Sequence, residues 1–113
     1  MKYLYLIMKT KIKVVGYIRS AQKENDEEIN KKISCLKEVF NKHEKDWDVI
    51  DILVDNGYSG RSDDRPGLKK IMSGEMDYSI LVTLGYHMIA RDVLLYRKVY
   101  QLLNSSGKSL YIM

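Results

Sequence analysis

The chain has 113 residues, a length that favours one compact domain over two. Hydrophobic residues make up 45% and charged residues 30%, the balance of a folded domain rather than of a disordered chain. The single cysteine, Cys35, excludes a disulfide framework, and it has no zinc-ligand spacing with His43 and His87. This use of cysteine predicts a cytoplasmic protein. No apolar run is long enough to cross a bilayer, so we expect no membrane partner.

The net charge of +4 comes from 19 basic and 15 acidic residues. Such a mild excess is compatible with a nucleic-acid partner but does not require one. The places where the basic residues gather are therefore more informative than their number.

The first half of the chain alternates apolar runs with one amphipathic stretch. Ile12 to Ile18 is a nearly continuous apolar run, typical of a buried strand. A helix is predicted over Asp26 to Phe40, with Asn25 or Asp26 as its cap. Its apolar stripe consists of Ile29, Ile33, Leu36 and Phe40. Trp47 to Val54 is predicted as the second strand.

The second half continues the alternation after a glycine-containing loop from Asn56 to Arg65. Pro66 suits the first turn of a short helix. Ser79 to Leu84 is predicted as a third buried strand, and Arg91 to Leu103 as a helix with one apolar face. Ser109 to Met113 is predicted as the last strand.

This order of elements predicts an α/β fold of three layers, with a mostly parallel sheet flanked by helices. In such sheets functional residues gather beyond the carboxyl ends of the strands. The three segments expected there are Arg19 to Lys23, Asp55 to Arg65 and Gly85 to Arg91.

Arginines occur in all three of these segments, and Asp55 directly follows the second predicted strand. The arginines are Arg19, Arg61, Arg65 and Arg91. Guanidinium groups converging on one sheet edge suit a phosphate or phosphodiester, because each offers a planar, charged pair of donors. In phosphoryl transfer they would stabilise the charge of the transition state.

Three short motifs resemble the serine recombinase (resolvase/invertase) catalytic domain. They are Gly16-Tyr17-Ile18-Arg19, Asp55-Asn56-Gly57-Tyr58-Ser59-Gly60 and Asp64-Arg65-Pro66-Gly67-Leu68. The resemblance implies attack of a serine on a DNA phosphodiester, which forms a phosphoserine link, and strand exchange within a tetramer. It also implies DNA as a partner and neither a metal nor a nucleotide cofactor.

Site residues follow from the resemblance by position. Arg19, Arg65 and Arg91 would hold the scissile phosphate, and Asp55 and Ser59 would organise the loop around it. Ser59 thereby counts among the DNA-phosphate-binding residues, and Asp55 among the catalytic ones. Asn30 stands where the family often has glutamine.

The chain departs from the family pattern at the nucleophile. The family places its serine two residues after the arginine, and Ala21 occupies that position here. Ser20 is adjacent, but alternation along a strand predicts that it faces away from Arg19, so it would serve as nucleophile only where the chain bulges or turns. After the third strand, Met88 replaces the first of two expected arginines and His87 replaces an acid.

The expected domain organisation is an extension and strand start over residues 1–12, followed by a resolvase-like catalytic domain over 13–113. Residues 1–7 precede a second possible start at Met8. The family's dimerisation helix and DNA-binding domain are not expected within this sequence. DNA binding is therefore expected to be weak or to depend on partner subunits, in a homo-oligomer or in a hetero-oligomer with a recombinase.

Three functional hypotheses remain open. The chain is an enzyme with Ser20 as nucleophile, a non-catalytic module that binds recombinase subunits or DNA, or an unrelated phosphate-binding domain. The last requires Arg19, Arg65 and Arg91 to be scattered in space. The tyrosines, Tyr96 and Tyr100 among them, are predicted to pack in the core or at an interface rather than to form a stacking stripe.

Overall fold

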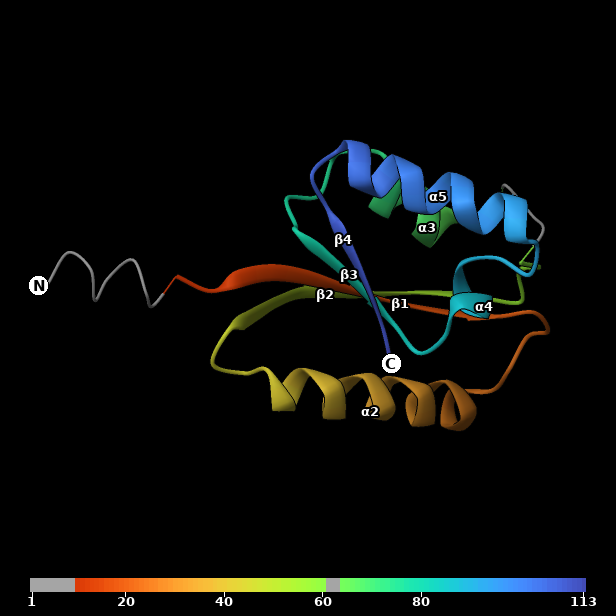
Figure 1. Cartoon of the computed structure of the whole chain (residues 1–113). Coiled ribbons are helices and arrows are strands. Elements are labelled where there is room, and N and C mark those ends of the chain that lie inside the picture. The colour runs from red at the N-terminus through yellow and green to blue at the C-terminus, as the bar shows by residue number, and fades with distance from the viewer. Residues whose placement is uncertain (1–9, 61–63) are drawn as a thin grey trace, which may run out of the picture.

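In the computed structural model, which describes residues 10–60 and 64–113, strands and helices alternate along the chain (Figure 1). The elements are β1 (Ile12–Ser20), α2 (Asp26–Lys42), β2 (Trp47–Asn56), α3 (Pro66–Met72), β3 (Ile80–Thr83), α4 (Tyr86–Ile89), α5 (Val93–Ser105) and β4 (Ser109–Ile112). Every predicted strand and helix is present.

The four strands form one parallel sheet in the order β2-β1-β3-β4. Helix α2 covers one face of the sheet, and α3 and α5 cover the other (Figure 1). The predicted three-layer α/β fold is confirmed. Because β1 pairs with β2 on one side and β3 on the other, the direction of winding changes between β1 and β3, and a crevice is expected at their carboxyl ends.

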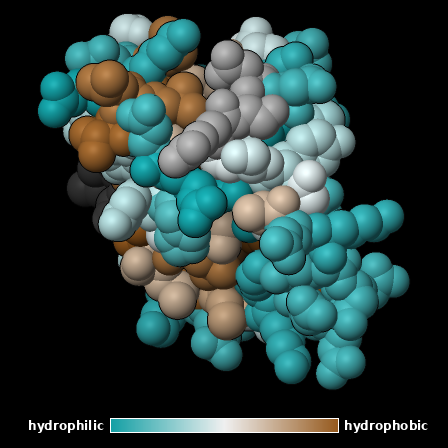
Figure 2. Space-filling model, turned by 90° about the vertical axis from the view of Figure 1, so that its right-hand side faces the viewer, coloured by the Kyte–Doolittle hydropathy of each residue, from teal (hydrophilic) through white to brown (hydrophobic). Residues whose placement is uncertain are grey.

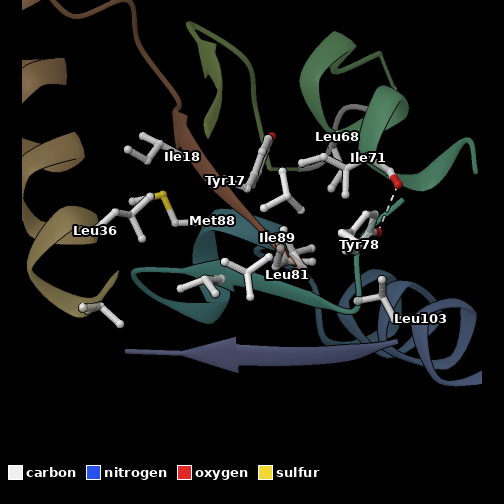
Figure 3. Packing of buried hydrophobic residues seen from close by; sticks show 14 of the residues in the cluster. Tyr17, Ile18, Leu36, Leu68, Ile71, Tyr78, Leu81, Met88, Ile89 and Leu103 are labelled. Atoms are coloured by element: carbon white, nitrogen blue, oxygen red, sulfur yellow. Dashed lines mark hydrogen bonds between the residues drawn. The ribbon is translucent and has the colours of Figure 1, made fainter. Parts of the chain in front are cut away.

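Strand β1 lies at the centre of the core, and its residues 14–20 are all buried. Gly16 allows α2 to approach this strand closely, because a Cβ there would lie 3.0 Å from Phe40 and 3.1 Å from Leu36. Figure 3 shows Leu36 close to Ile18 of β1 and to Met88. The apolar stripe predicted for the helix is therefore the side that packs on the sheet.

The opposite face of the sheet is covered by buried residues of α3 and α5 (Figure 3). Leu68 and Ile71 come from α3 and Leu103 from α5. Tyr78, which is 3% exposed, donates a hydrogen bond from its hydroxyl to the carbonyl of Ile71 at 3.0 Å. This bond fixes the end of α3 to the segment that enters β3.

An aromatic cluster lies at the end of the molecule where β1 and β2 begin. Trp47, the first residue of β2, stacks on His43 with ring centroids 3.9 Å apart. Tyr111 of β4 meets the tryptophan edge to face at 5.2 Å. The cluster thus joins the C-terminal end of α2 to both edge strands of the sheet.

Three details of the prediction need correction. The four-residue helix α4 was not predicted, because it has neither a capping side chain nor an apolar stripe. The helix predicted from Arg91 begins at Val93, since Asp92 caps it by accepting a bond from the Leu94 amide at 2.7 Å. The last strand ends at Ile112, one residue earlier than predicted.

The other boundaries agree within a few residues. Of the two candidate caps of the first helix, Asn25 is the one used, and its side chain accepts from the Glu28 amide at 2.9 Å. Residues 1–9 of the predicted N-terminal extension, and Arg61, lie outside the described residues. Within the described ranges, no helix has the length and apolar content needed to span a membrane.

Candidate functional site

A cavity of about 580 Å³ lies beyond the carboxyl end of β1. It is lined by residues 19–24, by Glu28 and Lys32 of α2, and by His87, Met88 and Arg91. Figure 2 views the molecule from this end, and hydrophilic side chains cover much of the surface there. The position agrees with the crevice expected from the order of the strands.

Arg19 is a buried cation of the cavity wall, with 5% of its surface exposed, and several hydrogen bonds hold its side chain in place. Its guanidinium donates from Nε to the Met88 carbonyl at 3.2 Å, from Nη1 to the Tyr58 carbonyl at 3.0 Å, and from Nη2 to the His87 carbonyl. Burial lowers the pKa of Arg19, and the nearby charge of Arg65 lowers it further. Three of the five donors of this side chain thus hold the loop of Tyr58 next to helix α4.

Arg91 comes close to Arg19 across Gly60. A Cβ at Gly60 would lie 2.7 Å from Cγ of Arg91 and 3.0 Å from Nη2 of Arg19, so a glycine is needed for the loop to pass between them. Arg91 is exposed and lines the cavity. The loop therefore brings two of the predicted arginines to one place.

Arg65 is buried beside Arg19 and is not one of the residues that line the cavity. It is 2% exposed, and its Nη1 donates to the Met88 carbonyl at 3.1 Å, which makes this oxygen a shared acceptor for Arg65 and Arg19. Arg65 lines a groove of about 230 Å³ between α3 and α5 rather than the cavity. The three arginines are close neighbours, but only Arg19 and Arg91 line the cavity.

Asp55 is a buried carboxylate that anchors the start of α3. It is 2% exposed and accepts bonds from the Tyr17 hydroxyl at 2.6 Å, the Gly67 amide at 2.7 Å and the Leu68 amide at 3.1 Å. Burial, and next the bond to Asp55, raise the pKa of Tyr17. Asp55 therefore fixes the end of the loop that follows β2 to the start of α3. Ser59 lies exposed within that loop.

Ser20 and Ala21 both border the cavity. Alternation along β1 is maintained: Gly16 abuts α2, whereas Tyr17 reaches Asp55 on the other face. The same alternation places Ser20 on the α2 side of the strand and Arg19 on the opposite side. The Ser20 hydroxyl donates to the Gln22 carbonyl at 2.5 Å. Ser20 reaches the cavity without a bulge at this position, because the cavity opens where β1 ends.

Met88 fills the place where the resemblance predicts an additional arginine. Its side chain is 4% exposed and packs near Ile18 and Leu36 (Figure 3). The Met88 sulfur accepts a bond from the Arg19 amide at 3.2 Å. The cavity consequently has a thioether in its wall where a guanidinium was expected.

Sequence reasoning missed the contribution of Glu24 and of α2, because the segment expected at the first strand ended at Lys23. Lys32 forms an ion pair with Glu24, with Nζ 2.7 and 2.8 Å from the two carboxylate oxygens. Asn56 holds this segment through two bonds to the Glu24 backbone, at 2.8 and 2.9 Å. The position of Glu24 next to that segment was a signal for its place at the cavity. Asn30 is exposed on α2 and is not among the lining residues.

The chemistry of the cavity is that of an anion site with an acidic side. Arg19, Arg91, Lys23 and Lys32 supply positive charge, and Glu24 and Glu28 lie toward α2. Residues 10–60 and 64–113 contain no group of three or more His, Cys, Asp or Glu side chains placed to hold a metal ion. Such guanidinium groups can bind a phosphate through charge-assisted hydrogen bonds.

Comparison with solved structures identifies the class of fold. The chain is similar to the C-terminal catalytic domain of ISC1926 TnpA, an IS607-like serine recombinase, with a TM-score of 0.75 and 19% identity over 90% of this chain and 68% of the other. It is also similar to the N-terminal catalytic domain of TP901-1 integrase, with a TM-score of 0.76 and 18% identity over 87% of this chain and 75% of the other. The fold is thus that of serine recombinase catalytic domains.

The sequence identifies the family. A resolvase family site-specific recombinase from Streptococcus pneumoniae is similar over 88% of this chain and 70% of its own, with 22% identity and a TM-score of 0.72. The family model for the resolvase N-terminal domain matches residues 14–113, and the chain belongs to this family. A search of curated proteins gave no match. Family membership rules out the hypothesis of an unrelated phosphate-binding domain.

Proposed function

We propose that this resolvase-family domain binds the DNA backbone at the cavity beyond β1 and that its covalent strand cleavage is impaired. The observation that carries the proposal is the approach of Arg19 and Arg91 across Gly60, which puts the side chains of two arginines beside one cavity. A phosphodiester is the ligand that fits such a pair, in a family whose chemistry is DNA recombination.

We expect impaired strand cleavage because two residues of the cavity wall lack the groups that the reaction needs. Ala21 has no oxygen that can attack phosphorus, and Met88 cannot donate to a phosphate oxygen. Loss of one donor to the transition state typically costs about 3–4 kcal/mol. Arg65, which the family pattern assigns to the phosphate, would act through the shared Met88 carbonyl by holding Arg19 in place.

We propose further that the domain acts together with recombinase subunits, as a homo-oligomer or as a hetero-oligomer with an active recombinase. An impaired subunit within such an assembly would reduce or redirect strand exchange by its partners. Co-sedimentation of the chain with a full-length recombinase of the same host tests this role. If the chain sediments as a monomer in the presence of each recombinase of the host, this role is contradicted.

Fluorescence anisotropy with a labelled DNA duplex tests the phosphate site. Replacing Arg91 by Gln removes one exposed cation of the cavity, so we expect roughly tenfold weaker binding and a salt dependence of log K that is less steep by about 0.9. Lys42→Gln, which removes an exposed charge at the far end of α2, is the matched control. Equal affinities of the two variants would show that DNA does not use this cavity.

A denaturing gel tests whether the domain cleaves DNA. After incubation with sheared genomic DNA of the host, we expect the natural chain to form no covalent adduct. The double variant Ala21→Ser, Met88→Arg should form one, because it restores an attacking oxygen and a donor.

Ser20 is the second candidate nucleophile, because its hydroxyl borders the same cavity as Arg19. In that case the natural chain would form an adduct, and Ser20→Ala would abolish it. This pair of results would replace the proposal of impaired cleavage by an active enzyme. An adduct unchanged in Ser20→Ala would exclude Ser20 as its source.

A further inference from the structure

Three tyrosines form a surface row across α4 and α5. Tyr86 and Tyr96 meet edge to face with ring centroids 6.2 Å apart, and Tyr96 and Tyr100 lie nearly parallel, at 19°, with centroids 6.4 Å apart. Tyr86 is 64% exposed and Tyr100 is 44% exposed. Tyr86 belongs to helix α4, which the sequence did not predict, so its position beside Tyr96 had no sign in the sequence.

The tyrosine row, defined as Tyr86, Tyr96 and Tyr100, borders a groove and continues to the cavity. The groove measures about 400 Å³ and is lined by Val93, Tyr96, Arg97 and Tyr100. A smaller hollow connects Tyr86 and Tyr96 with Arg91, which also lines the cavity. Figure 2 shows apolar side chains gathered on one side of this end of the molecule. A ligand held at the cavity can therefore continue onto the row.

The charges beside the row are mainly positive. Arg91 and Arg97 are exposed, and within the described ranges neither of them forms an ion pair. The nearby carboxylate, Asp92, is engaged as the cap of α5. Tyr96 is half-buried, whereas the rings of Tyr86 and Tyr100 are exposed. Such rings next to unpaired cations match a ligand with flat aromatic faces and an anionic backbone.

We propose that the tyrosine row binds single-stranded DNA, with unpaired bases stacked on Tyr96 and Tyr100 and the backbone held by Arg91 and Arg97. In a duplex the faces of the bases are covered by their neighbours, so only an unpaired strand offers them to the rings. This inference rests on the proposed function for DNA as the ligand, and it adds a second binding surface to the cavity.

The test uses the full chain and a fluorescein-labelled oligothymidylate of about 12 nucleotides, followed by anisotropy. The natural chain should bind it, and Tyr96→Ala and Tyr100→Ala should each bind roughly 5- to 100-fold more weakly. Tyr100→Phe should retain binding, because phenylalanine keeps the ring. Arg97→Gln should make the salt dependence of log K less steep by about 0.7.

Two control variants separate the row from other surfaces. Tyr111→Ala removes a tyrosine of the distant aromatic cluster, and Leu94→Ala removes the most exposed apolar side chain of α5, at 73%. Both should bind the oligonucleotide like the natural chain. Circular dichroism establishes that each variant is folded.

Several outcomes would overturn the inference. These are no binding of the oligonucleotide by the natural chain, unchanged binding by both alanine variants of the row, or equal losses in Tyr100→Ala and Tyr100→Phe. A monomer–dimer shift caused by Tyr100→Ala and Leu94→Ala, without a change in binding, would assign the face to a second copy of this chain instead. Duplex binding that still depends on Arg91 would leave the proposed function intact in all these cases.

Discussion

Asp55 illustrates how a residue taken from a motif can have a structural reason for its identity. Its carboxylate is buried and accepts three hydrogen bonds, two from the first amides of α3 and one from Tyr17. A carboxylate fits because all three partners are donors. Asp55 thus determines where α3 begins, and through α3 the position of Arg65.

We predict that Asp55→Asn lowers the free energy of unfolding by about 1–3 kcal/mol. The new amide group has only one acceptor oxygen, so at least one buried amide of α3 loses its partner. Urea denaturation measures the change, and Asp51→Asn, at an exposed position of β2, should change it by less than about 0.5 kcal/mol. Equal stabilities of these two variants would exclude the anchoring role of Asp55.

At the scale of elements, the connection between β1 and α2 is held by an adjacent strand. Asn56, the last residue of β2, bonds to both the amide and the carbonyl of Glu24. Glu24 in turn pairs with Lys32 of α2. The segment over residues 20–24, which forms one wall of the cavity, is therefore positioned by β2 as well as by its own strand.

Replacing Asn56 by Ala should lower duplex affinity several-fold and the free energy of unfolding by about 1–2 kcal/mol, because both bonds to Glu24 are lost. Anisotropy and urea denaturation measure the two effects. Asn41→Ala, at an exposed position near the end of α2, should change neither by a comparable amount. A loss of stability with unchanged affinity would mean that the position of this wall does not affect DNA binding.

The elements of the fold were predictable wherever a local pattern determines them. The apolar run before Arg19 is typical only of a buried strand, and the apolar stripe of α2 is typical only of a helix. Both elements lie where predicted. Helix α4 has four residues, too few to show a periodicity. Its presence depends on tertiary contacts of Met88 and Ile89, which are buried in the core.

At the scale of the whole molecule, the buried tyrosines Tyr17 and Tyr78 make the free energy of unfolding depend on pH. Burial raises the pKa of Tyr78 to about 12, and it raises the pKa of Tyr17 as well. An unfolded chain ionises both near their ordinary value of 10, whereas the folded chain keeps their protons. The unfolded state therefore binds fewer protons than the folded state in this range, and stability falls as the pH rises.

We expect the free energy of unfolding to decline from about pH 10 towards about pH 12. Tyr78→Phe should be about 1 kcal/mol less stable at neutral pH, because it loses the bond to Ile71, but its decline above pH 10 should be shallower. Urea denaturation of both chains over this range measures the slopes. Parallel slopes would show that Tyr78 is not responsible for the decline.

The candidate site was predictable in its location but not in its internal connections. Parallel strands bring their carboxyl ends to one edge, so the gathering of Arg19, Arg65 and Arg91 followed from topology. Arg19 donates three hydrogen bonds to backbone carbonyls, and Arg65 donates one to the Met88 carbonyl from the side of the groove. These contacts depend on how segments distant in sequence pack against each other. Such contacts have no signature in a local sequence pattern.

The aromatic cluster at the other end of the sheet gives the protein a built-in optical reporter. Trp47 is the only tryptophan of the chain, and its indole touches both the end of α2 and the last strand. Its emission should therefore report whether the first and last parts of the domain are assembled. Because Trp47 lies at the opposite end of the strands from the cavity, assembly and DNA binding can be followed in one sample by two separate signals.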